Sequence, residues 1–186
     1  MSEEMLAALD EVYGQANRLV AGVASEQWSA PTPCDEWDVR ALVNHMVGTS
    51  KVLHASASRT APSATPDDEH LGDDPVSAFR VQGDQTLAAW RRPGALEGEV
   101  DKPVEMPAVA ALGVNITDLG THCWDLATAT GQSLGLSDGT IEIIDQWNHI
   151  LVTDDVRAWG GFGEILEPSS DAQLDRMLAY VGRSSG

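Results

Sequence analysis

The chain has 186 residues, a formal net charge of −18 at pH 7, and only two phenylalanines and two tyrosines. This length is enough for one domain with a buried core that needs no disulfide or metal to hold it. An acidic surface repels phosphate backbones and anionic headgroups, so we expect neither nucleic acid nor a membrane as a partner. A halotolerant or high-GC source is the alternative explanation of the acidity. Few aromatic or β-branched runs occur, which favours an all-α fold.

The cysteines and the N-terminal segment indicate the compartment. Cys34 and Cys123 are the only two cysteines, too few for a disulfide framework. The first fifteen residues are acidic and amphipathic, without the basic and apolar regions of a secretory signal. No apolar run approaches the ~20 residues that span a bilayer. We therefore expect a soluble, cytoplasmic protein.

The N-terminal half contains two amphipathic segments separated by a turn. Apolar residues recur at three- and four-residue steps over 3–24, which predicts a first helix. Residues 28–34 contain two prolines and predict a turn, after which a second helix is expected over 39–57 with Asp38 as its N-cap. Residues 58–73 are rich in Ser, Thr, Pro and Asp and predict a long loop, either a flexible connector or a lid.

The C-terminal half continues the helical pattern. A third helix is expected from Asp74, with Pro75 at its first position, up to a stop at 91–94. The remaining expected elements are an irregular or weakly extended stretch 96–107, a helix 108–130 capped by Gly131, a helix 137–153, a loop 159–163, an extended stretch 165–168 and a short helix 171–181. This order predicts a single helical domain over 1–186 with one long crossover.

Three of the five histidines offer no chemical partner in the sequence. His54 lies nine residues after His45 and out of phase with it, and His70 lies in the polar loop. His149 also has no obvious neighbour. We interpret these three as surface or structural histidines.

A candidate metal site combines His45 with Asp118 and His122. Asp118 and His122 are four residues apart on one predicted helix and therefore project from the same face. With an imidazole from a facing helix they would supply three ligands and leave positions open, as catalytic sites do. The alternative from spacing alone is an ordinary hydrogen bond between Asp118 and His122 on the helix surface.

Three segments carry a resemblance to a known family: TPCDEWDVRALVNHMVG (32–48), ITDLGTHCWDLATATGQ (116–132) and GGFGEILEPSSDAQLDRMLAYVGR (160–183). Together they resemble the actinobacterial proteins related to the N-terminal domain of mycothiol-dependent maleylpyruvate isomerase, within the DinB/YfiT-like superfamily. The third segment resembles a short single-domain subgroup of that family.

The resemblance implies a DinB-like four-helix bundle with additional short helices and a bound divalent ion, typically zinc. Carried over residue by residue, it assigns His45, Asp118 and His122 as the metal ligands. Two departures from the family pattern stand at the site. The acidic ligand is generally glutamate in the isomerase, and Cys123 occupies a position where the family usually has glycine. One residue along a helix turns the side chain by about 100°, so we expect Cys123 not to bind the same ion.

Five further residues beside these motifs have open interpretations. For Trp37 and Trp124 we favour core packing over lining a pocket. We expect Asp38 to act as a helix cap. Asp125 either orients a ligand imidazole or contacts a bound thiol cofactor, with a structural salt bridge as the alternative. Cys34 is interpreted as a packing residue, because nothing in the sequence visibly activates its thiol.

The leading functional hypothesis is a metal-dependent, mycothiol-dependent transferase or isomerase acting on a small electrophile. The partners would be a small-molecule thiol and the electrophile, and a homodimer is also considered. A non-catalytic metal- or small-molecule-binding module is the alternative, since fold does not fix function. A third hypothesis is a bundle that has lost its ion. The chain leaves no room for the isomerase's further C-terminal domain, so we do not expect maleylpyruvate isomerase activity as such.

Overall fold

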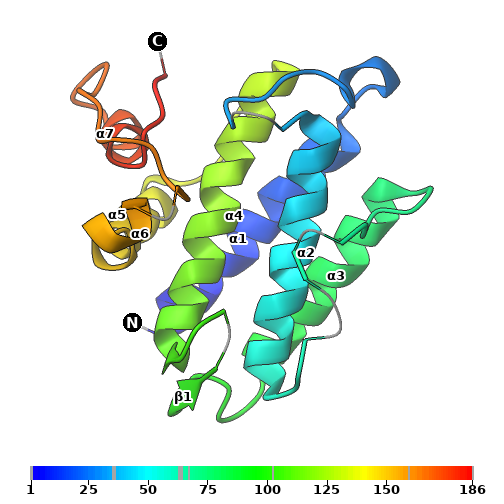
Figure 1. The fold of residues 1–186 in the computed structure, drawn as a ribbon, viewed down its shortest axis with the longest axis vertical. Helices are drawn as coiled ribbons and strands as arrows, with labels where there is room; N and C mark the ends of the chain where they lie inside the picture. Colours follow the sequence, from blue (N-terminus) through cyan, green and yellow to red (C-terminus); the bar gives the residue numbers. More distant parts are fainter. Residues whose placement is uncertain are drawn as a thin grey trace. The chain divides into compact units, whose positions relative to one another are not determined.

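The described part of the chain is built almost wholly from helices (Figure 1). The computed structural model describes residues 2–34, 37–62, 65–66, 68–101, 103–158 and 160–185. The helices are α1 Ser2–Ala21, a 3₁₀ turn Ser25–Gln27, α2 Val39–Ser58, α3 Pro75–Trp90, α4 Ala108–Thr130, α5 Asp138–Leu151, α6 Asp154–Ala158 and α7 Gln173–Tyr180. A short antiparallel hairpin joins β1 Glu99–Val100 to β2 Met106–Pro107. The predicted all-α class is confirmed.

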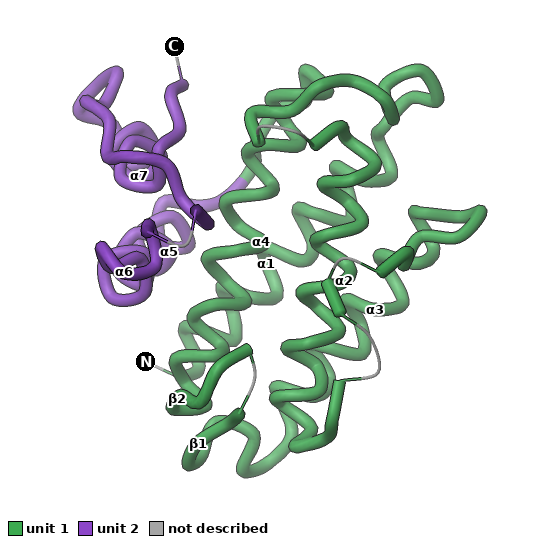
Figure 2. Tube along the Cα trace, viewed as in Figure 1, with its two compact units in different colours: residues 1–135 green, residues 136–186 purple. Residues whose placement is uncertain are grey.

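The chain forms two compact units, residues 1–135 and 136–186 (Figure 2). The first unit contains α1 to α4 and the hairpin, and the second contains α5 to α7. Compactness alone does not establish that a unit folds independently, so the single domain expected over 1–186 stays a prediction. The second unit includes α6, a short helix that the sequence pattern did not indicate.

Unit 1 is a four-helix bundle. Helix α1 packs against α3 and α4, and α2 packs against the same two helices. The direction of the chain is up in α1, down in α2 and α3, and up again in α4 (Figure 1). Because α2 and α3 lie side by side and run in the same direction, the chain must travel from the end of α2 back to the level of its start before α3 begins. Residues 59–74 make that return, which confirms the predicted long crossover.

The helix boundaries follow local signals that the sequence carries. The Asp38 carboxylate accepts a hydrogen bond from the backbone N–H of Ala41, and Asp74 caps α3 through the N–H of Ser77. Gly131 ends α4 with a φ of 68°, where a residue with a Cβ would be strained. These three caps agree with the sequence-based expectations.

Helix α1 ends at Ala21, three residues before the expected position. The reason is tertiary. The side-chain amide of Gln132 donates a hydrogen bond of 2.9 Å to the carbonyl of Leu19 in the last turn of α1. A Cβ at Gly22 would lie 2.3 Å from Oε1 of the same glutamine. The end of α1 is therefore fixed by a side chain from beyond the end of α4.

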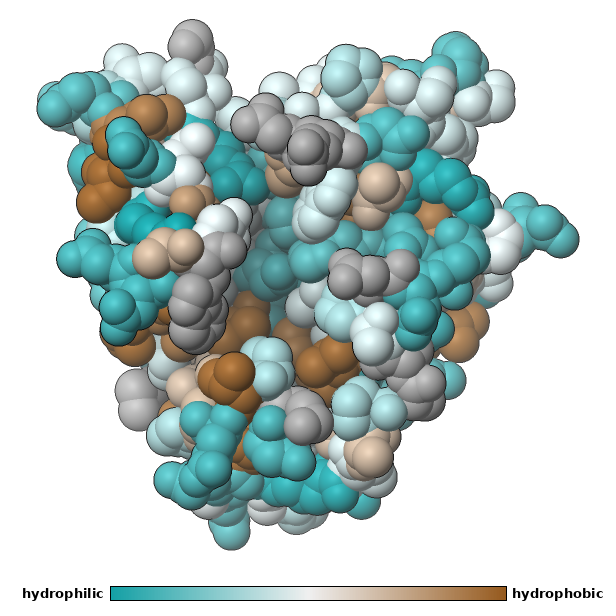
Figure 3. Space-filling model, viewed as in Figure 1, coloured by the Kyte–Doolittle hydropathy of each residue, from teal (hydrophilic) through white to brown (hydrophobic). Residues whose placement is uncertain are grey.

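Apolar side chains of all four helices fill the bundle. The core includes Leu9, Val12, Leu19, Leu42, Met46, Leu53, Phe79, Leu112, Ile116 and Leu119. The exposed large apolar side chains of unit 1, among the residues described, are Val76, Val81 and Val104. Hydrophilic residues cover most of the face seen in Figure 3. No helix among the described residues is both long and apolar enough to cross a bilayer.

A buried hydrogen-bond network crosses this apolar core. The hydroxyl of Tyr13 donates to Oγ of Ser50 at 2.9 Å and accepts from Nδ2 of Asn115 at 3.3 Å. Nε1 of Trp90 donates to Oδ1 of the same asparagine at 3.1 Å. These four residues come from α1, α2, α3 and α4. Burial raises the pKa of Tyr13, so its hydroxyl stays protonated and able to donate.

The crossover loop is held against α2 near Gly48. The side chain of Asn44 donates to the carbonyl of Asp68 and accepts from the backbone N–H of His70. A Cβ on Gly48 would lie 2.6 Å from the carbonyl oxygen of Pro66. The described part of the loop therefore packs on α2, and only a glycine allows this approach.

Unit 2 is organised around Tyr180. The ring of His149 contacts the Tyr180 ring with centroids 3.8 Å apart and the ring planes tilted by 42°. The guanidinium of Arg157 lies 4.9 Å from the Tyr180 ring centroid. The Tyr180 hydroxyl donates to the carbonyl of Val152 at 3.0 Å. Trp159, the start of a predicted loop, lies outside the described residues.

We predict that Tyr13→Phe destabilises the protein by about 1–3 kcal/mol, because Ser50 and Asn115 each lose a buried partner. Urea unfolding followed by circular dichroism measures the change. Tyr180→Phe is the matched control, since it removes a single hydrogen bond at a partly exposed site. A Tyr13→Phe loss no larger than that of Tyr180→Phe would contradict the role of the network.

A second prediction uses a pair of helical glycines. Gly48→Ala should lower the free energy of unfolding by about 1–3 kcal/mol, because the new Cβ would overlap the crossover loop. Gly14→Ala should raise it by roughly 0.5–1 kcal/mol, because nothing lies within 4 Å of a Cβ there and alanine is the better helix former. Urea midpoints of both variants check this, and equal effects would show that the loop does not depend on Gly48.

Candidate metal centre

Two antiparallel helices deliver the predicted ligands. His45 lies in the second turn of α2, whose start is fixed by the Asp38 cap. Asp118 and His122 lie one turn apart near the middle of α4. Because α2 and α4 pack against each other in opposite directions, the start of one faces the end of the other. The structure therefore brings together all three residues that the sequence analysis selected.

The three side chains converge on a small volume. Nε2 of His45 lies 3.3 Å from Oδ1 of Asp118, and Nε2 of His122 lies 3.8 Å from the same oxygen. One ligand atom from each residue lies within 4.8 Å of the other two. The two imidazole rings meet edge to face with centroids 5.0 Å apart. This arrangement points two ring nitrogens and one carboxylate oxygen at one another.

Asp125 fixes the orientation of His122. Its side chain is fully buried, and its Oδ2 lies 2.9 Å from Nδ1 of His122. A carboxylate only accepts, so this hydrogen bond requires the proton to be on Nδ1. Nε2 of His122 is then left with a free lone pair on the side of Asp118. Of the two roles expected for Asp125, the structure shows the orienting contact, and direct contact with a thiol cofactor stays a prediction.

Cys34 joins the same group of side chains. Its thiol donates a hydrogen bond of 3.0 Å to Oδ2 of Asp125 and lies 3.8 Å from Nδ1 of His122. The turn before α2 holds Cys34 in place: Oγ1 of Thr32 accepts from the Cys34 N–H and donates to the carbonyl of Trp37. The interpretation of Cys34 as a packing residue is thus incomplete, because its thiol contacts the candidate site.

Trp37 and Thr49 complete the surroundings. The Trp37 ring centroid is 4.5 Å from that of His45 and 5.9 Å from that of His122, so this tryptophan lines the site and is only partly buried. Core packing, which the sequence favoured for it, is wrong for Trp37, whereas Trp124 is buried as expected. Oγ1 of Thr49 lies 3.2 Å from Nε2 of His45, one turn further along α2.

The electrostatics of the site favour an ionised carboxylate. Burial by itself raises the pKa of Asp118. The attraction of His45, the hydrogen bond from that ring and the attraction of His122 together outweigh burial, so the pKa of Asp118 lies below its ordinary value. An ionised Asp118 beside two imidazoles is a donor set suited to a divalent cation.

The geometry also fits such an ion. Bonds of 2.0–2.1 Å in a tetrahedral site place nitrogen and oxygen ligands about 3.3 Å apart. The Asp118 carboxylate lies 3.3 and 3.8 Å from the two histidine nitrogens, so small side-chain adjustments would suffice. The outer hydrogen bond from His122 to a carboxylate is a usual support for a metal-binding imidazole.

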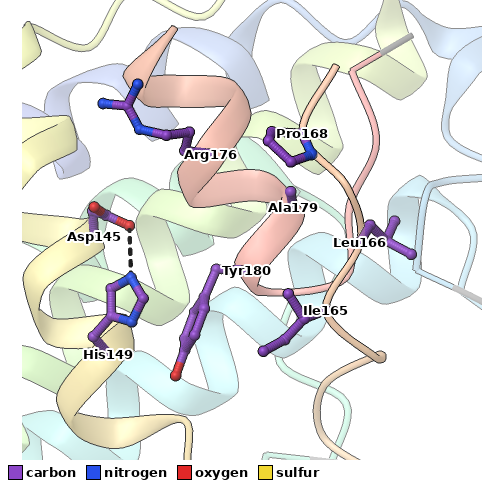
Figure 4. A pocket seen from close by; sticks show the side chains of 8 residues that line it. All are labelled: Asp145, His149, Ile165, Leu166, Pro168, Arg176, Ala179 and Tyr180. Carbon is purple, nitrogen blue, oxygen red and sulfur yellow. Dashed lines mark ion pairs between the residues drawn. The ribbon is translucent and has the colours of Figure 1, made fainter. Parts of the chain in front are cut away.

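The other three histidines lie apart from this group. Both ring nitrogens of His70 have partners, Thr65 and Lys51, where the crossover loop packs on α2. His149 lies 3.7 Å from Asp145 and lines a pocket of about 260 Å³ within unit 2 (Figure 4). These contacts agree with the structural interpretation of His70 and His149. His54 lies on α2, partly buried.

Cys34 and Thr49 are the residues of the site that sequence reasoning missed. Thr49 lies four positions after the predicted ligand His45. The i,i+4 spacing to His45 was a usable signal for Thr49. For Cys34 no local pattern exists, because its partner Asp125 is 91 positions away.

The two cysteines should differ sharply in reactivity. Cys34 is partly exposed, whereas Cys123 is fully buried with its sulfur towards the carbonyl of Val12. Burial strongly raises the pKa of Cys123 and so disfavours its reactive thiolate. We predict that a maleimide labels the folded protein once, at Cys34, and a second time only in denaturant. Mass spectrometry of native and Cys34→Ser protein checks this, and native labelling of Cys34→Ser would contradict it.

Comparison with known proteins agrees with the helical fold. Two uncharacterized proteins of Mycobacterium tuberculosis, from strains CDC 1551 / Oshkosh and ATCC 25618 / H37Rv, are each 36% identical to the chain over 120 residues. The similar region is 63% of this chain and 63% of the length of each relative. No solved structure is significantly similar. The family model for the mycothiol maleylpyruvate isomerase N-terminal domain matches residues 9–127, which lie in unit 1 and include all three predicted ligands. The chain therefore belongs to the mycothiol maleylpyruvate isomerase N-terminal domain family.

Proposed function

We propose that His45, Asp118 and His122 bind one divalent ion, zinc in the first instance, and that the thiol of mycothiol binds at this centre. The convergence of the three ligand atoms within 4.8 Å carries the proposal. The departure from the family's usual glutamate is compatible with it, because the shorter Asp118 already reaches both imidazoles. The matched family, named for a mycothiol-dependent isomerase, supports the choice of thiol.

The proposed activity is a thiol transfer or isomerisation on a small electrophile in the cytoplasm. A bound divalent ion would stabilise the thiolate of the cofactor at neutral pH, so no strong base is needed. Three protein ligands leave at least one position of a tetrahedral site for that sulfur. The protein's own residues bind and orient. Asp125 holds the proton of His122 on Nδ1, and the Trp37 ring lies against the His45 imidazole and near that of His122.

Thr49 would act beside the sulfur. Its hydroxyl lies 3.2 Å from Nε2 of His45, the atom that the proposal assigns to the ion. When that nitrogen is engaged, the hydroxyl is free to turn and to donate a hydrogen bond to an anionic sulfur or to a substrate oxygen. Thr49 is therefore a binding and orienting residue in this proposal, and it moves no proton of its own.

The proposal is tested by metal and thiol binding measured together. Zinc affinity, from competition with a chromophoric chelator, should fall in His45→Ala by more than the roughly 10–100-fold that loss of an outer partner costs. His54→Ala is the matched control, since it removes another histidine from the same helix and should leave the affinity unchanged. Calorimetric titration with mycothiol should give binding to the zinc-loaded protein and none after chelation.

The outcomes separate the candidate functions. Equal zinc affinity with and without His45→Ala would overturn the ligand assignment, both measured in Cys34→Ser protein so that the thiol near His122 cannot hold the ion. Tight zinc binding without any affinity for mycothiol would overturn the thiol-dependent activity and leave a non-catalytic metal-binding module. If both bind, turnover of electrophiles with mycothiol as co-substrate, followed by loss of free thiol, identifies the reaction class.

A further inference from the structure

His122 stands between two different groups of potential ligands. On its Nε2 side lie His45 and Asp118, the centre described above. On its Nδ1 side lie the carboxylate of Asp125 at 2.9 Å and the thiol of Cys34 at 3.8 Å. The two ring nitrogens of an imidazole point in divergent directions, so the second group is spatially separate from the first.

The second group has the spacing of a metal site. Cys34, Asp125 and His122 each offer one ligand atom within 4.8 Å of the other two. The three separations are 2.9 Å from nitrogen to oxygen, 3.0 Å from sulfur to oxygen and 3.8 Å from sulfur to nitrogen. In a tetrahedral zinc site the corresponding separations are about 3.3–3.6 Å. Shifts of a few tenths of an ångström would meet them.

The charges of this group also suit a divalent ion. Oδ2 of Asp125 accepts two hydrogen bonds, one from the Cys34 thiol and one from Nδ1 of His122. The thiol loses its proton when it binds a metal, whereas the imidazole binds as the neutral ring. A divalent ion that replaces the thiol proton therefore takes the group from a net charge of −1 to zero. The negative charge of the fully buried Asp125 would therefore have a partner both without and with the bound ion.

We propose that Cys34, Asp125 and Nδ1 of His122 form a second, thiolate-containing site for a borderline or soft divalent cation such as zinc. On binding, metal–sulfur, metal–oxygen and metal–nitrogen bonds form. The Cys34 S–H proton passes to solvent, and the ring proton of His122 moves through solvent from Nδ1 to Nε2, so the imidazole stays neutral. No group is oxidised or reduced. Thiolate selects softer ions than the nitrogen and oxygen donors of the first group do. When both groups are occupied, the ring proton of His122 also passes to solvent, and the imidazolate would join the two ions.

Cobalt(II) is the probe for this site, because a thiolate bound to cobalt gives an intense near-ultraviolet charge-transfer band that nitrogen and oxygen ligands do not give. Native protein titrated with cobalt should develop the band, and Cys34→Ser should lose it completely. Cys123→Ser is the matched control and should retain the band, since the Cys123 sulfur faces the Val12 carbonyl instead. Circular dichroism confirms that each variant is folded.

The same titration separates this inference from the proposed function. Visible cobalt absorption that persists in Cys34→Ser indicates cobalt bound at the first group, with His45 and Asp118. A charge-transfer band that persists in His45→Ala indicates cobalt bound at the second group, with Cys34 and Asp125. Bound cobalt without any charge-transfer band in native protein would overturn the thiolate site and leave the proposed function standing. A band that survives in Cys34→Ser, or disappears in His45→Ala, would also overturn it. A band in native protein with no cobalt bound by Cys34→Ser would support the second site and refute the first.

Discussion

The bundle depends on the hydrogen bonds that the hydroxyl of Tyr13 makes in its centre. It lies in the centre of an apolar core, and it reaches α2 through Ser50 and α4 through Asn115. Asn115 in turn accepts from Trp90 on α3, so a chain of three hydrogen bonds connects all four helices. Apolar contacts have no direction, whereas a buried polar group left without its particular partner costs about 1–3 kcal/mol. The network therefore fixes the register of the helices.

That register sets the geometry of the candidate site. Asn115 precedes Asp118 by three residues on α4, and Ser50 follows His45 by five on α2. Both members of the network thus lie about one turn from a candidate ligand. A slide of one helix by a single residue would move its side chains by 1.5 Å along the axis. Such a shift is nearly half of the 3.3 Å between Asp118 and His45. The buried hydrogen-bond network therefore also holds the candidate ligands at their distances from one another.

His122 contacts members of both groups of side chains in the site, Asp118 on one side and Asp125 on the other. Asp125 fixes the tautomer of His122, and Asp118 lies on the opposite side of the ring. Cys34 is connected to His122 through the same Asp125 oxygen. Changes at Cys34 and Asp125 should therefore alter the behaviour of His122. Through Cys34, the turn before α2 contacts the candidate centre as well as connecting two helices.

The sequence by itself determined the class, the order of the helices and the likeness to a known family, because these depend on local signals and short motifs. Helical periodicity, the caps at Asp38, Asp74 and Gly131, and the i,i+4 pair Asp118–His122 can all be read within a few residues. Only the tertiary structure decided which distant residues meet. The end of α1 depends on Gln132, the placement of Trp37 beside the histidines depends on the turn held by Thr32, and the contact of Cys34 with Asp125 joins positions 91 apart. The physical reason is that hydrogen bonds across the bundle depend on helix packing and register, which no local stretch of sequence specifies.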